Sequence, residues 1–316
     1  MKKKPFVTNS MPVDENAELA KAYSVSRSTT FDTLRSIART LWRNKRSRVG
    51  ICVMLFFVLI SIFGPMLVNP VKLKEFDVLN KFAPPSREHW LGTDGNGRDT
   101  LLQWLAGTRN VLVVAFIAAA MTIFIAMVVG MVSGLCGGIV DDVLMFITNI
   151  ILTVPSLPIM MLLSMVIQAS SPLMFGFLLS IWSWAGLARS IRSQILTVKH
   201  RDYVEAARIL GMPMRYIILS EMLPSITSYL TMNLIFSMRS AINASVVLMY
   251  LGLVTFSAQH WGSMLQIALG SSGALFGSSA IWYFMTPVVS IALFGMGCFF
   301  FSSGLDEALN PRLRQQ

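Results

Sequence analysis

The amino-acid sequence predicts an all-α integral membrane protein with six transmembrane helices. Its 316 residues are 54% apolar and only 13% charged, a balance that is foreign to soluble domains of this size. The apolar residues form continuous runs of roughly 20, the helix length that crosses a hydrocarbon core. Continuous runs also exclude a transmembrane β-barrel, whose strands alternate apolar and polar residues.

The distribution of basic residues predicts the orientation of these helices. Of the 26 Lys and Arg residues, 11 lie in residues 1–48, 6 in residues 189–215 and 2 after residue 303, against 6 in residues 71–109. Because Lys and Arg gather in cytoplasmic segments, both termini and residues 189–215 are expected inside the cell. No basic groove with interleaved aromatic residues is visible, so the net charge of +10 does not indicate nucleic acid as a partner.

Four regions are expected along the chain. Residues 1–34 form a polar cytoplasmic tail, and residues 35–107 hold an amphipathic helix, the first transmembrane helix and an outer loop. Residues 108–303 form the main transmembrane domain, and residues 304–316 a cytoplasmic tail. Helical alternation of apolar and basic residues before residue 48 indicates the amphipathic helix; a simple basic flank of the first span explains the same residues.

The first three spans are expected at residues 49–68, 110–135 and 143–167. Gly130 and Gly134 offer a small-residue packing face on the second span. Pro155 and Pro158 should kink the third, because proline lacks the N–H that closes a helical turn.

The outer loop between the first two spans, residues 71–109, is rich in turn-forming Pro and Gly. Four of its polar residues are expected to bind one another: Asp94, Asn96, Arg98 and Asp99. A cation site is the alternative, although the spacing lacks the terminal Glu of an EF-hand.

The last three spans are expected at residues 172–187, 224–254 and 281–301. Arg239 lies in the fifth span, where a charge costs on the order of 3 kcal/mol on insertion scales, so it should face protein or water. Neighbouring polar residues extend this into a predicted stripe along a solute pathway: Asn233, Ser237, Ser240 and Asn243. An outward-snorkelling arginine is the alternative.

A polar stretch, residues 189–224, interrupts the apolar blocks. Residues 201–210 are good helix formers, and the spacing i, i+3, i+4, i+7 puts four side chains on one face: Tyr203, Ala206, Ala207 and Leu210. Gly211 can take the left-handed conformation that ends a helix, and Pro213 suits the first turn of the next. The stretch predicts a helix–turn–helix knob that fits a cleft on a soluble partner.

Four short motifs occur along the chain: HWLGTDGNGRD at residues 89–99, EAARILG at 205–211 with a trailing Leu-Pro, YLGL at 250–253 and NPRLR at 310–314. Together they resemble the C-type permease subunit of the dipeptide, oligopeptide and nickel family of ATP-binding cassette (ABC) importers, over about residues 35–314. The resemblance implies a type I ABC importer permease fold, with residues 108–303 as its ABC type-1 transmembrane domain. It implies a cytoplasmic coupling helix whose ATPase-contacting residues are Glu205, Ala206, Ala207, Gly211, Leu223 and Pro224.

The resemblance also implies partners and a location. The partners are a homologous permease subunit, two ATP-binding subunits and an extracellular solute-binding protein, in a bacterial or archaeal inner or plasma membrane. The sequence contains no GxxxxGK[ST], so ATP and Mg²⁺ belong to the partner ATPases and no cofactor or metal is expected on this chain.

The resemblance implies that the solute is an oligopeptide or a dipeptide. Ser245 stands where many relatives have Glu, and Asn310 where Asp is usual. These two departures leave an oligosaccharide open as the solute.

Two other classes of function fit parts of the sequence. A stand-alone channel or ion-coupled carrier would need intramembrane acids or an inverted repeat, and no Asp or Glu lies within a predicted span. The letters GSSG at residues 270–273 are similar to the serine motif of rhomboid proteases. That chemistry needs a histidine on a neighbouring span, and none of the three falls in one: His89, His200 and His260.

Overall fold

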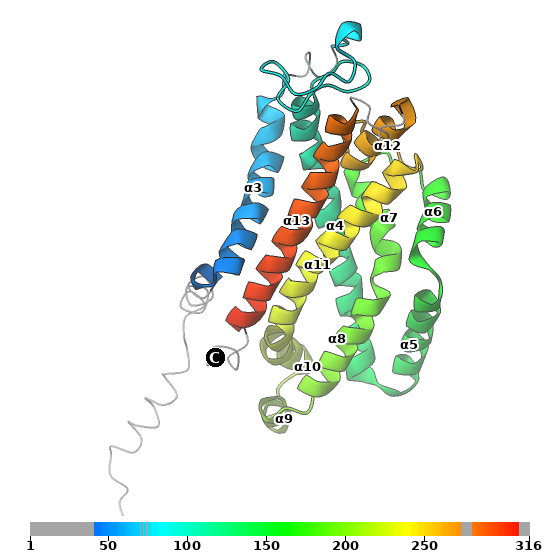
Figure 1. Cartoon of the computed structure of the whole chain (residues 1–316). Helices are drawn as coiled ribbons and strands as arrows, with labels where there is room; N and C mark the ends of the chain where they lie inside the picture. The colour runs from blue at the N-terminus through cyan, green and yellow to red at the C-terminus, as the bar shows by residue number, and fades with distance from the viewer. Residues whose placement is uncertain (1–40, 70, 72, 74, 273–279, 310–316) are drawn as a thin grey trace, which may run out of the picture.

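The computed structural model describes residues 41–69, 71, 73, 75–272 and 280–309, which form a bundle of long helices (Figure 1). Within these ranges the extended backbone is limited to one isolated bridge between Thr93 and Asp99. The N-terminal tail, most of the amphipathic helix, the last residue of the GSSG motif and the NPRLR tail lie outside the described residues.

The helices of the bundle follow the order of the six predicted spans. Four are continuous: α3 (Lys45–Leu67), α4 (Thr100–Cys136), the helix Met214–Tyr250 and α13 (Ile281–Leu309). The other two are broken pairs, α5 (Gly138–Thr153) with α6 (Ser156–Val166), and α7 (Pro172–Ser183) with α8 (Ala185–Val198). The two halves are bent by 93° in the first pair and by 59° in the second. The described helices therefore number four spans, or six when each bent pair counts as one.

The third span was expected to kink at both of its prolines, but it breaks at one of them. Val154 and Pro155 have extended backbone between α5 and α6, because a proline pushes the residue before it out of the helical region. Pro158 lies in the first turn of α6, where a missing N–H leaves no helical bond unmade. Only Pro155 therefore interrupts the span.

Three other boundaries differ from those predicted. The second span starts at Thr100 because the Asp99 side chain accepts a hydrogen bond from the backbone N–H of Leu102 (3.0 Å) and caps α4. The fourth span continues through α8 to Val198, so the polar stretch begins as a helix. The fifth span has no start at Pro224, because α10 (Met214–Tyr216), η2 (Ile217–Met222) and α11 (Leu223–Tyr250) follow without a break.

Helix α4 lies at the centre of the bundle, and two of its glycines allow α8 to pack closely against it. A Cβ on Gly130 would lie 2.6 Å from the carbonyl oxygen of Ala188, and one on Gly134 would lie 2.8 Å from Cγ2 of Ile195. The predicted small-residue face is therefore confirmed, with α8 as its partner. Lys199 reinforces the contact by donating from Nζ to the carbonyl oxygen of Leu135 (3.0 Å).

The apolar core has two parts along the bundle. Around α3, α4, α13 and α12 (Trp261–Ser272), Phe57 stacks edge-on against Trp261 and Phe294, with ring centroids 5.8 and 5.5 Å apart. The second part packs α4 and α8 against η2, the start of α11, and Val204 and Ala207. His260, expected in an outer loop, is fully buried beside Phe175, and desolvation lowers the pKa of its imidazole to about 3.

Candidate functional site

The predicted knob is a short helix, α9 (Asp202–Ile209), at the end of the bundle opposite the outer loop (Figure 1). Gly211 closes it with a φ of +71°, a conformation that costs other residues energy because of their Cβ. The N–H of Gly211 donates to the carbonyl of Arg208 (2.9 Å), and that of Met212 donates to the carbonyl of Ala207 (3.1 Å). These two bonds form a Schellman motif, so the predicted helix and turn are confirmed.

Alpha 9 is attached to both neighbouring spans. Val204 and Ala207 are buried in a cluster that includes Ile195 of α8 and Ile217 of η2. The hydroxyl groups of Tyr203 and Ser225 lie 2.8 Å apart and tie α9 to α11. Alpha 9 therefore shares an apolar cluster with α8 and η2 and is linked to α11 through Tyr203 and Ser225.

The exposed side of α9 carries both apolar and charged residues, and it includes three of the four residues of the predicted face. Ala207 is buried, whereas Tyr203, Ala206 and Leu210 are exposed. Ile209 is 86% exposed and Leu210 74%. Exposed apolar residues grouped at one end of a protein mark a contact with another protein.

The remaining predicted coupling residues fall into two groups. Glu205 is exposed, with its Oε1 4.0 Å from Nδ1 of His200. Leu223 and Pro224 start α11 directly after the π-helical turn η2. A proline lacks the N–H of an α-helical bond and its ring crowds the carbonyl four residues earlier, so the wider π turn accommodates Pro224.

A cavity of about 700 Å³ lies between α4, the two bent pairs and α11. Its lining residues within the described part of the chain are all uncharged. The polar ones come from every wall: Thr122, Ser156, Trp182, Ser183, Ser237, Ser240 and Asn243. The cavity therefore offers hydrogen-bonding groups to a solute without selecting for the sign of its charge.

Only part of the predicted polar stripe lies in the cavity. Ser237, Ser240 and Asn243 line the cavity, whereas Asn233 donates its side-chain N–H to the carbonyl of Tyr229 (2.9 Å) in its own helix. Arg239 is exposed and lies against α13, with its Nε 3.6 Å from the place that a Cβ on Gly295 would occupy. Arg239 and Asn233 are therefore outside the cavity.

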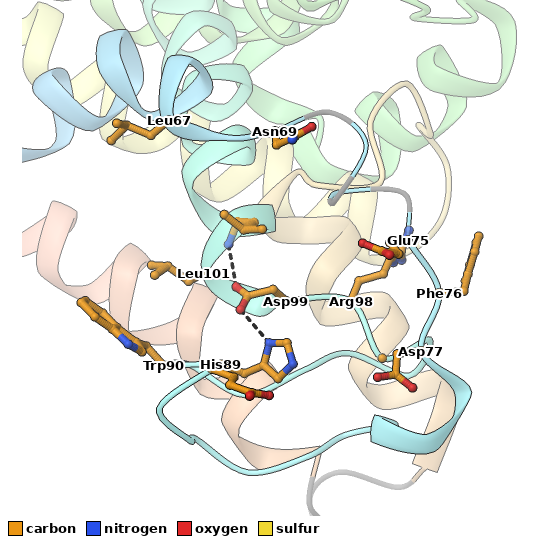
Figure 2. A pocket seen from close by; sticks show the side chains of 13 residues that line it. Leu67, Asn69, Glu75, Phe76, Asp77, His89, Trp90, Arg98, Asp99 and Leu101 are labelled. Atoms are coloured by element: carbon orange, nitrogen blue, oxygen red, sulfur yellow. Dashed lines mark hydrogen bonds and ion pairs between the residues drawn. The ribbon is translucent and has the colours of Figure 1, made fainter.

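A second cavity, of about 730 Å³, lies under the outer loop (Figure 2). In Figure 2 a dashed line joins His89 to Asp99, the residue that caps α4. Nδ1 of His89 lies 2.9 Å from Oδ2 of Asp99. Asp77 also lines this cavity, and the side-chain amide of Asn80 donates to its carboxylate (2.8 Å) and lowers its pKa. Among the described residues, no three His, Cys, Asp or Glu side chains are grouped as metal ligands.

The outer loop is organised by Asp94, which is fully buried. Its carboxylate accepts hydrogen bonds from Nε of Arg98 (2.8 Å) and from the side chain of Gln103 (3.1 Å). The hydroxyl of Tyr283 donates to Gln103 (3.2 Å) and so connects the loop to α13. The predicted mutual binding of Asp94 and Arg98 is confirmed.

Sequence reasoning missed a polar cluster at the base of α5. Arg192 of α8 donates from Nε to Oδ1 of Asp141 (2.5 Å), and the hydroxyl of Ser133 donates to the same oxygen. A possible signal was that Asp141 and Arg192 are opposite charges at the same end of neighbouring spans.

Comparison with known proteins gives two family matches. The model of the binding-protein-dependent transport system inner membrane component matches residues 126–315. The model of the N-terminal TM domain of oligopeptide transport permease C matches residues 33–85.

Several relatives match along most of their length. The oligopeptide transport system permease protein OppC of Bacillus subtilis is 30% identical over 273 residues, covering 86% of this chain and 87% of the relative. The dipeptide transport system permease protein DppC of the same organism is 30% identical over 278 residues, 88% of this chain and 85% of the relative. OppC of Haemophilus influenzae is 30% identical over 280 residues, which cover 87% of this chain and 88% of the relative.

Proposed function

The chain belongs to the family of binding-protein-dependent transport system inner membrane components, and from this premise we propose that it is the permease subunit of an ATP-driven peptide importer. It is a multi-pass membrane protein and a transport component, not an enzyme. The observation that carries the proposal is α9 with its C-cap residue, where Ile209 and Leu210 are exposed. Relatives named for oligopeptide and dipeptide transport support a peptide as the solute.

In this proposal α9 is the coupling helix. Glu205, Ala206 and Gly211 face the ATPase, Ala207 holds α9 to the bundle, and Leu223 and Pro224 position the start of α11. Two ATP-binding subunits supply ATP and Mg²⁺. Residues 108–303 form the ABC type-1 transmembrane domain, and both termini lie on the cytoplasmic side with α9.

The uncharged cavity is this chain's half of the solute pathway. A homologous permease subunit supplies the facing wall, and a solute-binding protein delivers the peptide at the end that bears the outer loop. Ser237, Ser240 and Asn243 offer hydroxyl and amide groups that pair with the backbone of a peptide, which every peptide has regardless of its side chains. Neutral walls therefore suit a carrier of peptides of mixed charge.

ATP-driven uptake tests the proposal directly. We expect proteoliposomes that contain this chain, the homologous permease and both ATP-binding subunits to take up a labelled tripeptide when ATP and the binding protein are supplied. A labelled oligosaccharide serves as the comparison solute. Equal uptake by this chain alone, without an ATPase, would identify a stand-alone carrier and contradict the proposal.

A bulky residue at Ser240 is expected to obstruct the pathway. In Ser240→Trp, the indole fills part of the cavity, so uptake should fall by about tenfold, or about 1.4 kcal/mol in the transport barrier. Initial uptake rates at equal protein abundance measure the effect. Ser240→Ala removes one hydroxyl without adding bulk, so it should lower uptake less than Ser240→Trp does. Arg239→Gln changes a residue outside the cavity and should keep the wild-type rate; a loss in Arg239→Gln alone would move the pathway to the α13 side.

A further inference from the structure

We propose that α5 is a jointed helix that follows the movement of α8, and that Arg189 and Arg192 are the positioning residues that make it follow. This inference rests on the proposed role of α9 as the coupling helix. In it, the two arginines carry a displacement of α9 to the wall of the cavity.

Alpha 5 has a joint at each end. Gly137 and Gly138 connect it to α4, with φ values of +66° and +54°, and no atom lies within 4 Å of where a Cβ would be on either. At its other end the break at Val154 and Pro155 bends the chain by 93° into α6. Open space around a pair of glycines and a proline break leave α5 free to turn relative to its neighbours in sequence.

The apolar residues of α5 are half-buried or exposed, and its fully buried residues are polar. The structure describes every residue of α5, and the buried ones are two polar residues, Asp141 and Thr148. The hydroxyl of Thr148 is used within α5, where it donates to the carbonyl of Leu144 (2.7 Å). Asp141 is therefore the buried residue through which α5 is held.

Two arginines on one face of α8 make the links. Arg192 grips the Asp141 carboxylate with two nitrogens, Nε at 2.5 Å from Oδ1 and Nη2 on Oδ2, the two-pronged geometry that fixes orientation as well as distance. One turn earlier on α8, Nη2 of Arg189 donates to the side-chain oxygen of Asn149 (2.5 Å). Because Asp141 and Asn149 are two turns apart, the links prevent α5 from pivoting about either one.

The links complete a path from α9 to the cavity. Three residues separate α8 from α9, and Ile195 and Val198 of α8 pack in the same cluster as Val204 of α9. At the far end of α5, Ile151 and Leu152 line the cavity. With the links intact, α5 moves together with α8. Without them, α9 moves α8 but not α5, so the part of the cavity wall that α5 forms stays in place.

The complete importer in proteoliposomes tests this path, with tripeptide uptake and ATP hydrolysis measured on the same vesicles. We expect Asp141→Asn and Arg192→Gln to keep binding-protein-stimulated ATP hydrolysis while uptake per ATP falls by about tenfold, within the range that coupling mutations span. The charge exchange Asp141→Arg with Arg192→Asp should recover part of the lost uptake. Asp142→Asn removes the same charge from the exposed neighbouring position and should leave uptake per ATP unchanged.

Arg189→Gln provides a variant that is less able to disturb folding, because Arg189 and Asn149 are exposed. It should lower uptake per ATP by about twofold to threefold without altering the amount of complex. Uptake and hydrolysis that fall together with complex abundance would make the links merely structural and overturn the inference. Unchanged uptake per ATP in Asp141→Asn, or a charge exchange that recovers nothing, would also overturn it. A wild-type complex without ATP-driven uptake would instead contradict the proposed function.

Discussion

Gly211→Val is expected to reduce ATP-driven uptake by more than about tenfold while the protein still reaches the membrane. Gly211 has a φ of +71°, and a side chain with a Cβ loses roughly 1–2 kcal/mol in that left-handed conformation. Leaving it breaks the bonds from Gly211 to Arg208 and from Met212 to Ala207. The end of α9 then unwinds, and Leu210 no longer projects where an ATPase would receive it.

The control for this variant is a residue that tolerates the same backbone. No atom lies within 4 Å of the place that a Cβ on Gly211 would occupy, so the effect of valine is conformational and not a clash. Gly211→Asn should therefore keep most of the uptake, because asparagine enters the left-handed region far more readily than a β-branched residue. Uptake and ATP hydrolysis in the reconstituted importer measure both variants. Equal activity in both would mean that the turn has no part in coupling.

Asp94→Ala is expected to cause the largest loss of stability. Asp94 is fully buried and accepts from Arg98 and from Gln103, which in turn receives the hydroxyl of Tyr283. Removing one member of a buried ion pair typically costs about 3–5 kcal/mol, and in this variant the largely buried guanidinium of Arg98 loses its carboxylate partner. The loop, the start of α4 and the outer end of α13 should then lose their connection.

Thermal unfolding of the purified chain in detergent measures this loss. Asp77→Ala, in the same loop, is the matched control, because the side-chain contacts of Asp77 are with its near neighbours Leu79 and Asn80. We expect the midpoint of unfolding to drop markedly for Asp94→Ala and to change little for Asp77→Ala. Similar midpoints for the two variants would remove Asp94 from the centre of the loop.

The turn at Gly211 was predictable because a Schellman motif is built from residues adjacent in sequence. The burial of Ala207 was not, because it depends on a cluster with Ile195 and Ile217, and the periodicity within eight residues does not include those partners. The same reason explains Arg239. Its depth in a span is visible in the sequence, whereas its place beside Gly295 and not in the cavity depends on how α11 is rotated against α13.

The sequence by itself determined the membrane class, the order of the six spans and the position of the turn at Gly211. Apolar runs must leave water, and backbone conformation at Gly and Pro follows local sterics. Only the tertiary structure decided the break at Pro155, the burial of His260 and the pairing of Asp141 with Arg192, which lie 51 residues apart. Such partners are selected by packing of distant helices, so their geometry is a property of the folded bundle and not of any one segment.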